Sequence, residues 1–283
     1  MKTAIKTLLL ATTIVVLSAC DIIDNPVQTP DINPPDTGTY NQNVLLEDYT
    51  GHTCGNCPAA AEEAHLIETT FGKDRVIVVA VHAGPFAFTN SSYPLDWTCP
   101  EGNELDQTFR NSRAGNPNGL VNRTERSGKF ILSKDDWAPA TVVELAKDPR
   151  MGLSAESSWD ADSKTVTVDV DMTFLTEGTP DYQIVAIITE SKLVGDQLDY
   201  RKTPSHVEDY EFDHVLRTSI NGTWGEPISA ENIEAGTEMK KQFEYTFSSS
   251  SGWVPENCDV VVYVHQYNTT KEIVQVTKVG VVE

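Results

Sequence analysis

The chain has 283 residues and is strongly acidic, with 42 acidic against 21 basic side chains and a formal charge of −21 at pH 7. An anionic surface repels the phosphates of nucleic acids, so we expect no nucleic-acid partner. Hydrophobic residues make up 39% of the chain, enough to bury a core, and the length favours about two domains. The five cysteines are an odd number, so in an exported protein at least one stands outside any disulfide.

Residues 1–19 predict a signal peptide. Two lysines precede an almost continuously apolar run over residues 8–17, which is too short to span a bilayer. The Leu-Ser-Ala-Cys sequence that ends at Cys20 resembles the lipobox of bacterial lipoproteins, and this resemblance implies that Cys20 is lipidated and becomes the new N-terminus. The alternative is an ordinary signal peptide with an unrelated cysteine at its end. Lipidation accounts for the odd cysteine and predicts membrane anchoring through lipid.

Residues 20–42 predict an extended tether. Four prolines stand among polar residues, with hardly any apolar side chain after Val27. Proline-rich segments of this kind extend by about 3 Å per residue, so the tether would hold a folded body away from its anchor. Removal of the signal peptide takes away two lysines and no acidic residue, which brings the formal charge of the mature chain to −23.

A strand, a Cys-x-x-Cys motif and a helix follow the tether. Residues 43–49 and 76–81 are apolar runs, and the second lacks alternation, as is typical of a strand buried on both faces of a parallel sheet. Residues 59–71 between them predict a helix. The pattern is that of a βαβ unit with Cys54 and Cys57 at the start of its helix.

The start of a helix favours a thiolate, because unpaired amide groups and the positive end of the helix dipole lower the pKa of a thiol there. Cys54 is therefore the predicted nucleophile, and Cys57, one turn further on, would resolve a mixed disulfide. Two alternatives stay open at this point. A zinc site would need a second pair of ligands that the sequence lacks. A permanent structural disulfide forms readily in an exported chain.

These residues resemble the thioredoxin-like superfamily. The resemblance implies that Asp48, six residues before Cys54, is a buried acid that takes the proton of the resolving thiol. It also implies a cis-proline that faces the motif and lets extended partner backbone approach the sulfurs, and Pro117 is the best candidate. Thr53 and Asn56 depart from the thioredoxin pattern, so the redox direction is left open.

A narrower resemblance covers nearly the whole chain. Residues 45–51, 54–58, 81–84 and 115–123 are similar to the lipoproteins related to outer membrane protein 28. That family implies a lipid anchor in the outer membrane, facing the periplasm or the surface, a thioredoxin-like domain and a β-rich C-terminal region. An attachment or surface-receptor role has been suggested for the group. From the residues themselves we expect no cofactor and no metal.

The α/β thioredoxin-like domain is expected over residues 43–150. An insert at 84–116 is longer than a simple connection and would cover or flank the motif. It contains one helical stretch, residues 104–112, and a helix over 133–147 closes the domain.

Residues 151–283 predict an all-β antiparallel domain. Apolar and polar residues alternate over 165–174, as is typical of a strand with one buried face. Further strands are expected at residues 183–189, 243–247, 259–267 and 272–282. The economical interpretation is an immunoglobulin-like sandwich. Residues 160–163 predict its first hairpin turn, whereas a calcium loop there lacks the remaining ligands.

Residues 195–227 predict a long irregular loop. Its mixed histidines and carboxylates invite a metal site, but their spacing fits no standard ligand motif, so a solvated acidic loop is favoured. Outside the CxxC, Cys99 and Cys258 either pair or stay free and buried, and the second is favoured because Cys258 opens an apolar strand.

Two functions follow from the sequence. The first is a membrane-anchored thiol-disulfide protein, in which Cys54, Cys57, Asp48 and Pro117 act on a protein thiol or disulfide partner. The second is an outer membrane binding or attachment lipoprotein, in which the β domain holds a surface ligand and the CxxC is a structural disulfide. Fold alone does not choose between them.

Overall fold

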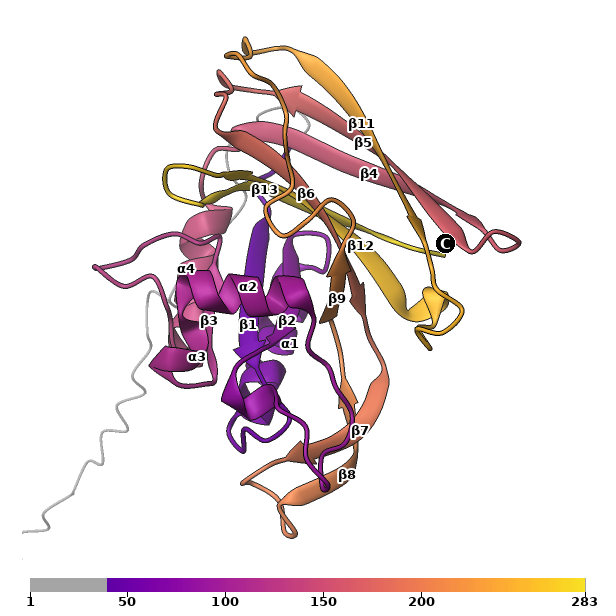
Figure 1. The fold of residues 1–283 in the computed structure, drawn as a ribbon. Coiled ribbons are helices and arrows are strands. Elements are labelled where there is room, and N and C mark those ends of the chain that lie inside the picture. The colour runs from indigo at the N-terminus through magenta and orange to yellow at the C-terminus, as the bar shows by residue number, and fades with distance from the viewer. Residues whose placement is uncertain (1–39, 283) are drawn as a thin grey trace, which may run out of the picture. The chain divides into compact units, whose positions relative to one another are not determined.

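The N-terminal half of the folded chain alternates strands and helices (Figure 1). The structure, a computed structural model, describes residues 40–282, so the predicted signal peptide, Cys20 and most of the predicted tether lie outside the described residues. The elements in chain order are β1 (Val44–Thr50), α1 (Cys57–Phe71), β2 (Val76–His82), the 3₁₀ helix η1 (Pro85–Ala87), α2 (Pro100–Phe109), α3 (Asn111–Ala114), β3 (Asn118–Val121) and α4 (Lys134–Leu145).

The C-terminal half is built from strands and one short 3₁₀ helix over the described residues 151–282. Its elements are β4 (Met151–Asp160), β5 (Thr165–Phe174), β6 (Tyr182–Glu190), β7 (Leu193–Leu198), β8 (His206–Phe212), β9 (Val215–Ser219), β10 (Glu226–Pro227), β11 (Glu238–Thr246), η2 (Pro255–Asn257), β12 (Cys258–Gln266) and β13 (Ile273–Gly280). Each strand predicted in this half is present. The sequence did not predict β4, which precedes the expected hairpin turn at residues 160–163.

The predicted βαβ unit is confirmed. β1 and β2 are parallel, with their registers running from Val44 beside Val76 to Thr50 beside His82. β3 lies antiparallel on the other side of β1. Every residue of β1 is buried, because its side chains point alternately into the two cores that cover the two faces of the sheet.

Helix α1 begins at Cys57 and ends at Phe71, close to the predicted bounds. Pro58 stands in its first turn, where the missing N–H is no loss, and Gly72 ends it with a φ of 100° that favours glycine. Ala60 and Ala64 point to the sheet, one turn apart. α1 and α4 pack on one face of the sheet, and α2 crosses the other (Figure 1).

Strands from both halves of the chain form one sheet. Among the described residues it has eight strands, in the order β13, β12, β6, β9, β2, β1, β3, with β10 paired to β6 off this path. β9 joins the halves: it is parallel to β2 at Ala80 and Val215, and the N–H of Ala80 donates to the carbonyl of His214 over 2.8 Å. The sheet therefore continues past residue 150, which the sequence did not predict.

The second sheet consists of β11, β5 and β4. The alternation in β5 is confirmed, since Val166, Val168 and Val170 are buried and Asp169 is exposed. These valines share a core with β6 and β12. The prediction of α/β structure followed by antiparallel β structure is thus confirmed in its coarser form. The C-terminal half stacks its three-stranded sheet on the extension of the mixed sheet.

β12 shows why the two halves merge. Val260 and Val262 point into the core shared with the second sheet, whereas Val261 and Tyr263 point into the core shared with β1, β2 and α2. A strand that lacks alternation is apolar because both of its faces are covered. The continuous apolar run in this half therefore marks its place inside a larger sheet.

Residues 195–227, predicted as an irregular loop, contain strands instead. β7 and β8 form an antiparallel hairpin, called here the β7–β8 arm (residues 193–212), and β9 and β10 join the mixed sheet. Most of the arm's residues are exposed or half-buried, so few apolar positions mark its alternation. Because so many side chains of this segment are charged, its sequence pattern did not predict these strands.

A buried ion pair lies on the α2 face of the sheet. Nε and Nη2 of Arg123 donate to the two carboxylate oxygens of Glu47, each over 2.8 Å. Nη2 also lies 3.3 Å from the hydroxyl of Tyr263 in β12, and the guanidinium stands 5.1 Å from the ring centre of Phe109 in α2. The pair thus links β1 to elements of both halves.

Candidate functional site at the Cys54–Cys57 disulfide

The CxxC motif forms a tight turn between the end of β1 and the start of α1. Cys54 and Cys57 are joined by a disulfide, with their Cα atoms 5.4 Å apart. The N–H of Cys54 donates to the carbonyl of Gly51, and the N–H of Cys57 donates to the carbonyl of Cys54. The second sulfur thus stands in the first turn of the helix, as the sequence predicted.

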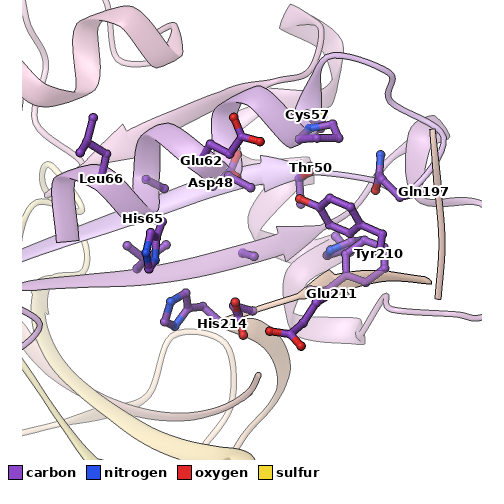
Figure 2. Close-up of a pocket in the computed structure, with 18 of the residues that line it drawn as sticks. Asp48, Thr50, Cys57, Glu62, His65, Leu66, Gln197, Tyr210, Glu211 and His214 are labelled. Carbon is purple, nitrogen blue, oxygen red and sulfur yellow. The ribbon is translucent and has the colours of Figure 1, made fainter. Parts of the chain in front are cut away.

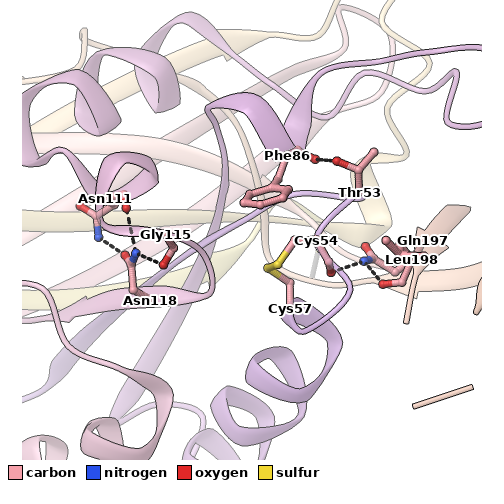
Figure 3. The surroundings of a disulfide bond; sticks show 9 residues. All are labelled: Thr53, Cys54, Cys57, Phe86, Asn111, Gly115, Asn118, Gln197 and Leu198. Atoms are coloured by element: carbon pink, nitrogen blue, oxygen red, sulfur yellow. Dashed lines mark hydrogen bonds between the residues drawn. A yellow bond between two sulfur atoms is a disulfide. The ribbon is translucent and has the colours of Figure 1, made fainter. Parts of the chain in front are cut away.

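The insert covers one side of this turn (Figure 3). The carbonyl of Phe86 accepts from both the N–H and the hydroxyl of Thr53, over 3.0 and 2.9 Å. A Cβ on Gly51 would lie 2.4 Å from the backbone of Phe86, so only glycine allows this approach. Phe86, which belongs to the segment 84–116, therefore lies directly against the residue before Cys54.

The β7–β8 arm covers the other side. Nε2 of Gln197 donates to the carbonyl of Cys54 over 3.1 Å, and the N–H of Tyr200 donates to the carbonyl of Gly55 over 2.9 Å. A Cβ on Gly55 would lie 2.6 Å from the Tyr200 ring. Between the insert and the arm, only 3% of Cys54 and 2% of Cys57 are exposed.

Polar side chains fasten the arm at its outer edge. The guanidinium of Arg201 makes two hydrogen bonds to Glu62 on α1, over 2.6 and 2.9 Å, and two more to Asp199. Arg201 and Glu62 are both largely exposed, so this ion pair adds little stability. The arm is therefore held to α1 by contacts that water can readily replace.

An aromatic stack connects the turn, the insert and the arm. Tyr93 of the insert stacks on His52 with ring centres 5.8 Å apart, and on His206 of the arm with ring centres 4.8 Å apart. His206 also contacts Asp196, with Nε2 and Oδ1 2.6 Å apart. Burial lowers the pKa of His52 and keeps that ring neutral at physiological pH.

Asp48 lies in the half of β1 nearer the CxxC, with only 2% of its surface exposed. Its Oδ1 has no hydrogen-bond partner among residues 40–282. Burial raises the pKa of this carboxyl to about 7, because water no longer stabilises its charge. A carboxyl with a pKa near neutrality is suited to giving and taking protons at neutral pH.

A cavity of about 490 Å³ joins Asp48 to the disulfide. We call it the α1 groove: it lies between α1 and the segment 210–214, and its floor is formed by residues 48, 50, 78, 80 and 82 of β1 and β2 (Figure 2). Cys57 stands at one end and Thr69 lines the other. Asp48 and Cys57 thus line one cavity.

The loop before β3 lies beside the same end of β1, because Asn118 pairs with Tyr49. The Asn116–Pro117 peptide bond is cis. Nδ2 of Asn118 donates to the carbonyls of Asn111 and Gly115, over 2.8 and 2.9 Å (Figure 3). These bonds fix the course of the loop that carries Pro117.

Comparison with known proteins now gives the family. A family model described as "Outer membrane protein Omp28" matches residues 104–283. The chain belongs to the Omp28 family. The predicted resemblance to the proteins related to outer membrane protein 28 is therefore confirmed, and so is the predicted localisation as an outer membrane lipoprotein. No curated protein matches the chain.

Two solved structures, both of proteins from Porphyromonas gingivalis, are similar to this chain. HBP35 of Porphyromonas gingivalis aligns with a TM-score of 0.62 and 17% identity, over 86% of this chain and 76% of that one. This likeness shows the fold alone. A domain of the outer membrane lipoprotein Omp28 from Porphyromonas gingivalis aligns over 47% of this chain and 89% of that one, with 21% identity and a TM-score of 0.31, too low to support an inference.

None of the helices described for residues 40–282 combines the length and the apolar character needed to cross a bilayer. The same residues contain no group of three or more histidine, cysteine or acidic side chains placed to hold a metal ion. The predicted lipidation at Cys20 lies outside the described residues and stays a prediction.

The two remaining cysteines of the described chain are free and buried. Sγ of Cys99 accepts from the N–H of Gly102 at 3.3 Å, and Sγ of Cys258 lies 3.3 Å from the carbonyl of Val254. Burial raises the pKa of each thiol to about 12. Of the two alternatives, the structure thus has free thiols, and neither is a thiolate at neutral pH.

Sequence reasoning missed the residues that cover the disulfide. Phe86 contributes a backbone carbonyl, which any residue type would supply. Gln197 and Tyr200 lie 140 residues or more beyond the motif, in a segment predicted to be irregular. The only sequence signal was Gly51 and Gly55, whose missing side chains allow two segments to approach the turn.

Proposed function

We propose that this outer membrane lipoprotein performs thiol-disulfide exchange through Cys54 and Cys57, within a thioredoxin-like arrangement formed by β9, β2, β1 and β3 with α1 and α4. The observation that carries the proposal is Asp48, a buried carboxyl without a hydrogen-bond partner at Oδ1, in the same cavity as Cys57. A disulfide used only as a staple has no need of such a group. Residues 43–150 would be the catalytic part, and 151–283 the part that completes its sheet.

The exchange starts from the oxidised form. A thiolate of a partner protein attacks Sγ of Cys54, the Cys54–Cys57 bond breaks, and Cys57 leaves as a thiolate that takes a proton from Asp48. A second partner thiolate then attacks the partner sulfur of the mixed disulfide, and Cys54 leaves as a thiolate. Two electrons pass from the partner dithiol to the Cys54–Cys57 disulfide, and the partner becomes a disulfide.

The reverse reaction uses the same groups. Cys54 attacks a partner disulfide as a thiolate, which the start of α1 favours. Ionised Asp48 takes the proton of Cys57, and the Cys57 thiolate resolves the mixed disulfide. In both directions Pro117 would position extended partner backbone beside the sulfurs, on the loop that Asn118 fixes next to β1.

A second candidate function rests on the cover over the motif. With 3% of Cys54 exposed, a partner reaches its sulfur only after the β7–β8 arm or the insert moves. This burial favours a binding or attachment lipoprotein whose disulfide joins β1 to α1 permanently, with the ligand held elsewhere on the β structure.

One experiment separates the two. The Cys57→Ala variant is expressed as the full chain, and disulfide-linked partners are collected from the membrane fraction under acid quench, with Cys54→Ala and Cys57→Ala together as the matched control. Exchange predicts mixed disulfides that need Cys54 and disappear in the double variant. If Cys57→Ala forms none, and the disulfide of the unchanged protein equilibrates with glutathione buffers only at potentials far below the surrounding pool, exchange is contradicted and the static disulfide is supported.

A further inference from the structure

Two buried polar atoms on the floor of the α1 groove lack partners. Oδ1 of Asp48 and Nδ1 of His82 each have none among the described residues, and the side chains are 2% and 3% exposed. The register places Thr50 beside His82, so the two groups belong to the same face of neighbouring strands. A buried polar group left unpaired costs about 1–3 kcal/mol, and native structures retain few of them. A ligand that supplies the missing partner recovers that cost.

The charge around Asp48 is one-sided. No lysine or arginine lines the α1 groove. From α1, Glu62 and His65 face it, and Glu62 is already paired with Arg201, while Cys57 is held in the disulfide. From β2, His82 faces it, and burial lowers the pKa of that imidazole to about 3, so it carries no positive charge.

The segment 210–214 closes the groove opposite α1 and adds to the same charge. It presents Tyr210, Glu211, Asp213 and His214. Glu211 and Asp213 have no ion-pair partner within 4 Å among residues 40–282, and Asp213 accepts only the N–H of Lys192. Tyr210 and Asp48 line the same cavity. Burial, and after it the charge of Asp48, raise the pKa of Tyr210. The groove thus combines a buried unpaired acid with a negative mouth.

The remaining walls are apolar. Ala61 and Ala64 from α1, Val78 and Ala80 from β2, and the ring of Phe212 line the space between the charged groups. Sites that bind small molecules are typically apolar clefts of this size with a few convergent polar groups. An aromatic face near a carboxylate also favours a cation.

We propose that the α1 groove binds a small organic cation, an ammonium or amidinium attached to an apolar alkyl or aryl group, with its charged end paired to Asp48 and its apolar body against α1. The charge requirement follows from Asp48, Glu211 and Asp213, and the apolar requirement from the walls. Because the ligand would occupy the carboxyl that exchanges protons with Cys57, its binding would also slow thiol-disulfide exchange. That last consequence, unlike the binding itself, rests on the proposed function.

The probe is benzylammonium, with benzyl alcohol and benzoate as the neutral and anionic analogues of the same size. Binding is measured by calorimetry on the full chain in detergent, with the disulfide oxidised and no thiol present, so that the outcome does not depend on turnover at Cys54. We expect benzylammonium to bind at least tenfold more tightly than benzyl alcohol, and benzoate not to bind. The affinity for benzylammonium should rise as the pH increases from 5.5 to 8, because Asp48 becomes ionised.

Three variants test the location. Asp48→Asn should bring the two affinities within threefold and flatten the part of the pH dependence that Asp48 causes, whereas Asp169→Asn, an exposed acid on the second sheet, should change neither. Ala61→Trp, which fills the groove from a half-exposed wall, should abolish binding of both probes. Equal affinities in the unchanged protein, no binding of benzylammonium at 10 mM in roughly neutral buffer, or a preference that survives in Asp48→Asn would overturn the proposal.

Discussion

Glu47 and Asp48 are consecutive residues of β1, both acidic and both 2% exposed, yet their surroundings differ completely. Because neighbouring side chains of a strand point to opposite faces, Glu47 enters the α2 face and Asp48 the α1 face. Glu47 meets the guanidinium of Arg123 with two hydrogen bonds, whereas Oδ1 of Asp48 meets no partner. The paired acid stabilises the junction of two halves, and the unpaired acid keeps a pKa near 7 beside a disulfide.

The paired face should be the more sensitive to mutation. Arg123→Met keeps most of the side-chain volume but leaves Glu47 buried without a counter-ion, and such a loss costs about 3–5 kcal/mol. Urea unfolding should show a decrease of that size. Lys240→Met, which removes an exposed ion pair with Asp171 on the second sheet, should leave the urea midpoint nearly unchanged. A loss below 1 kcal/mol for Arg123→Met would contradict the structural role of the pair.

For the unpaired Asp48 the expected effect is the opposite: removing its charge should raise the unfolding free energy. The pKa of Asp48 in the folded protein, about 7, lies above the ordinary value of 3.8. Between these two values the unfolded state ionises first, so the unfolding free energy falls as the pH rises and stays level above about pH 7. Asp48→Asn removes this loss and should be more stable than the unchanged protein by roughly 4 kcal/mol at pH 8.

Unfolding measured from pH 4 to 8 with the disulfide intact checks this sign. The advantage of Asp48→Asn should shrink toward pH 4, where the carboxyl is protonated in the folded state. Asp169→Asn is the matched control, because its carboxyl is exposed on β5. A stability difference that does not change with pH would mean that Asp48 is not the group that titrates.

A smaller effect is expected when the β7–β8 arm over the disulfide is loosened. Gln197→Ala removes the hydrogen bond to the carbonyl of Cys54, worth about 1 kcal/mol, and should loosen the β7–β8 arm. The initial rate at which glutathione reduces the disulfide should then rise about fivefold, the factor that corresponds to 1 kcal/mol. Gln242→Ala, an exposed glutamine bonded to Asp169, should leave the rate unchanged. An unchanged rate in Gln197→Ala would show that the arm does not limit access.

The smallest effect is expected at the other cysteines. Cys99 and Cys258 should resist alkylation by iodoacetamide at pH 8 in the folded protein, because burial raises their pKa to about 12. After reduction, Cys54 and Cys57 should be modified, and in urea all four should react. Mass spectrometry of the modified peptides reads this out, and native labelling of Cys99 at the rate of a free thiol would be the contrary result.

The sequence was sufficient for the local part of the site. The βαβ unit and the position of the CxxC at the start of α1 both follow from residues within one stretch of chain, where period and spacing are short-range signals. The resemblance to a known family supplied the roles of Asp48 and Pro117, which spacing alone does not give.

The contacts between distant segments of the chain could not be predicted from the sequence. β9 and the β7–β8 arm find their places by pairing with strands and turns well over a hundred residues earlier in the chain, and no local pattern records such a partner. The unbroken apolar runs of β6 and β12 did carry a signal, since both faces of these strands had to be covered. That signal did not identify the elements that would cover the second face, so an immunoglobulin-like sandwich was the simpler interpretation.

The two ends of β1 differ in what holds them. At its beginning, Nε2 of Gln42 donates to the carbonyl of Val274, Nδ2 of Asn43 donates to the carbonyl of Val276, and Nε2 of Gln275 donates to the carbonyl of Asn41. A pulling force applied at residue 41 would therefore be transmitted through these hydrogen bonds to β13 and, from there, to the other strands of the mixed sheet. The CxxC turn lies at the opposite end of β1, away from these hydrogen bonds to β13.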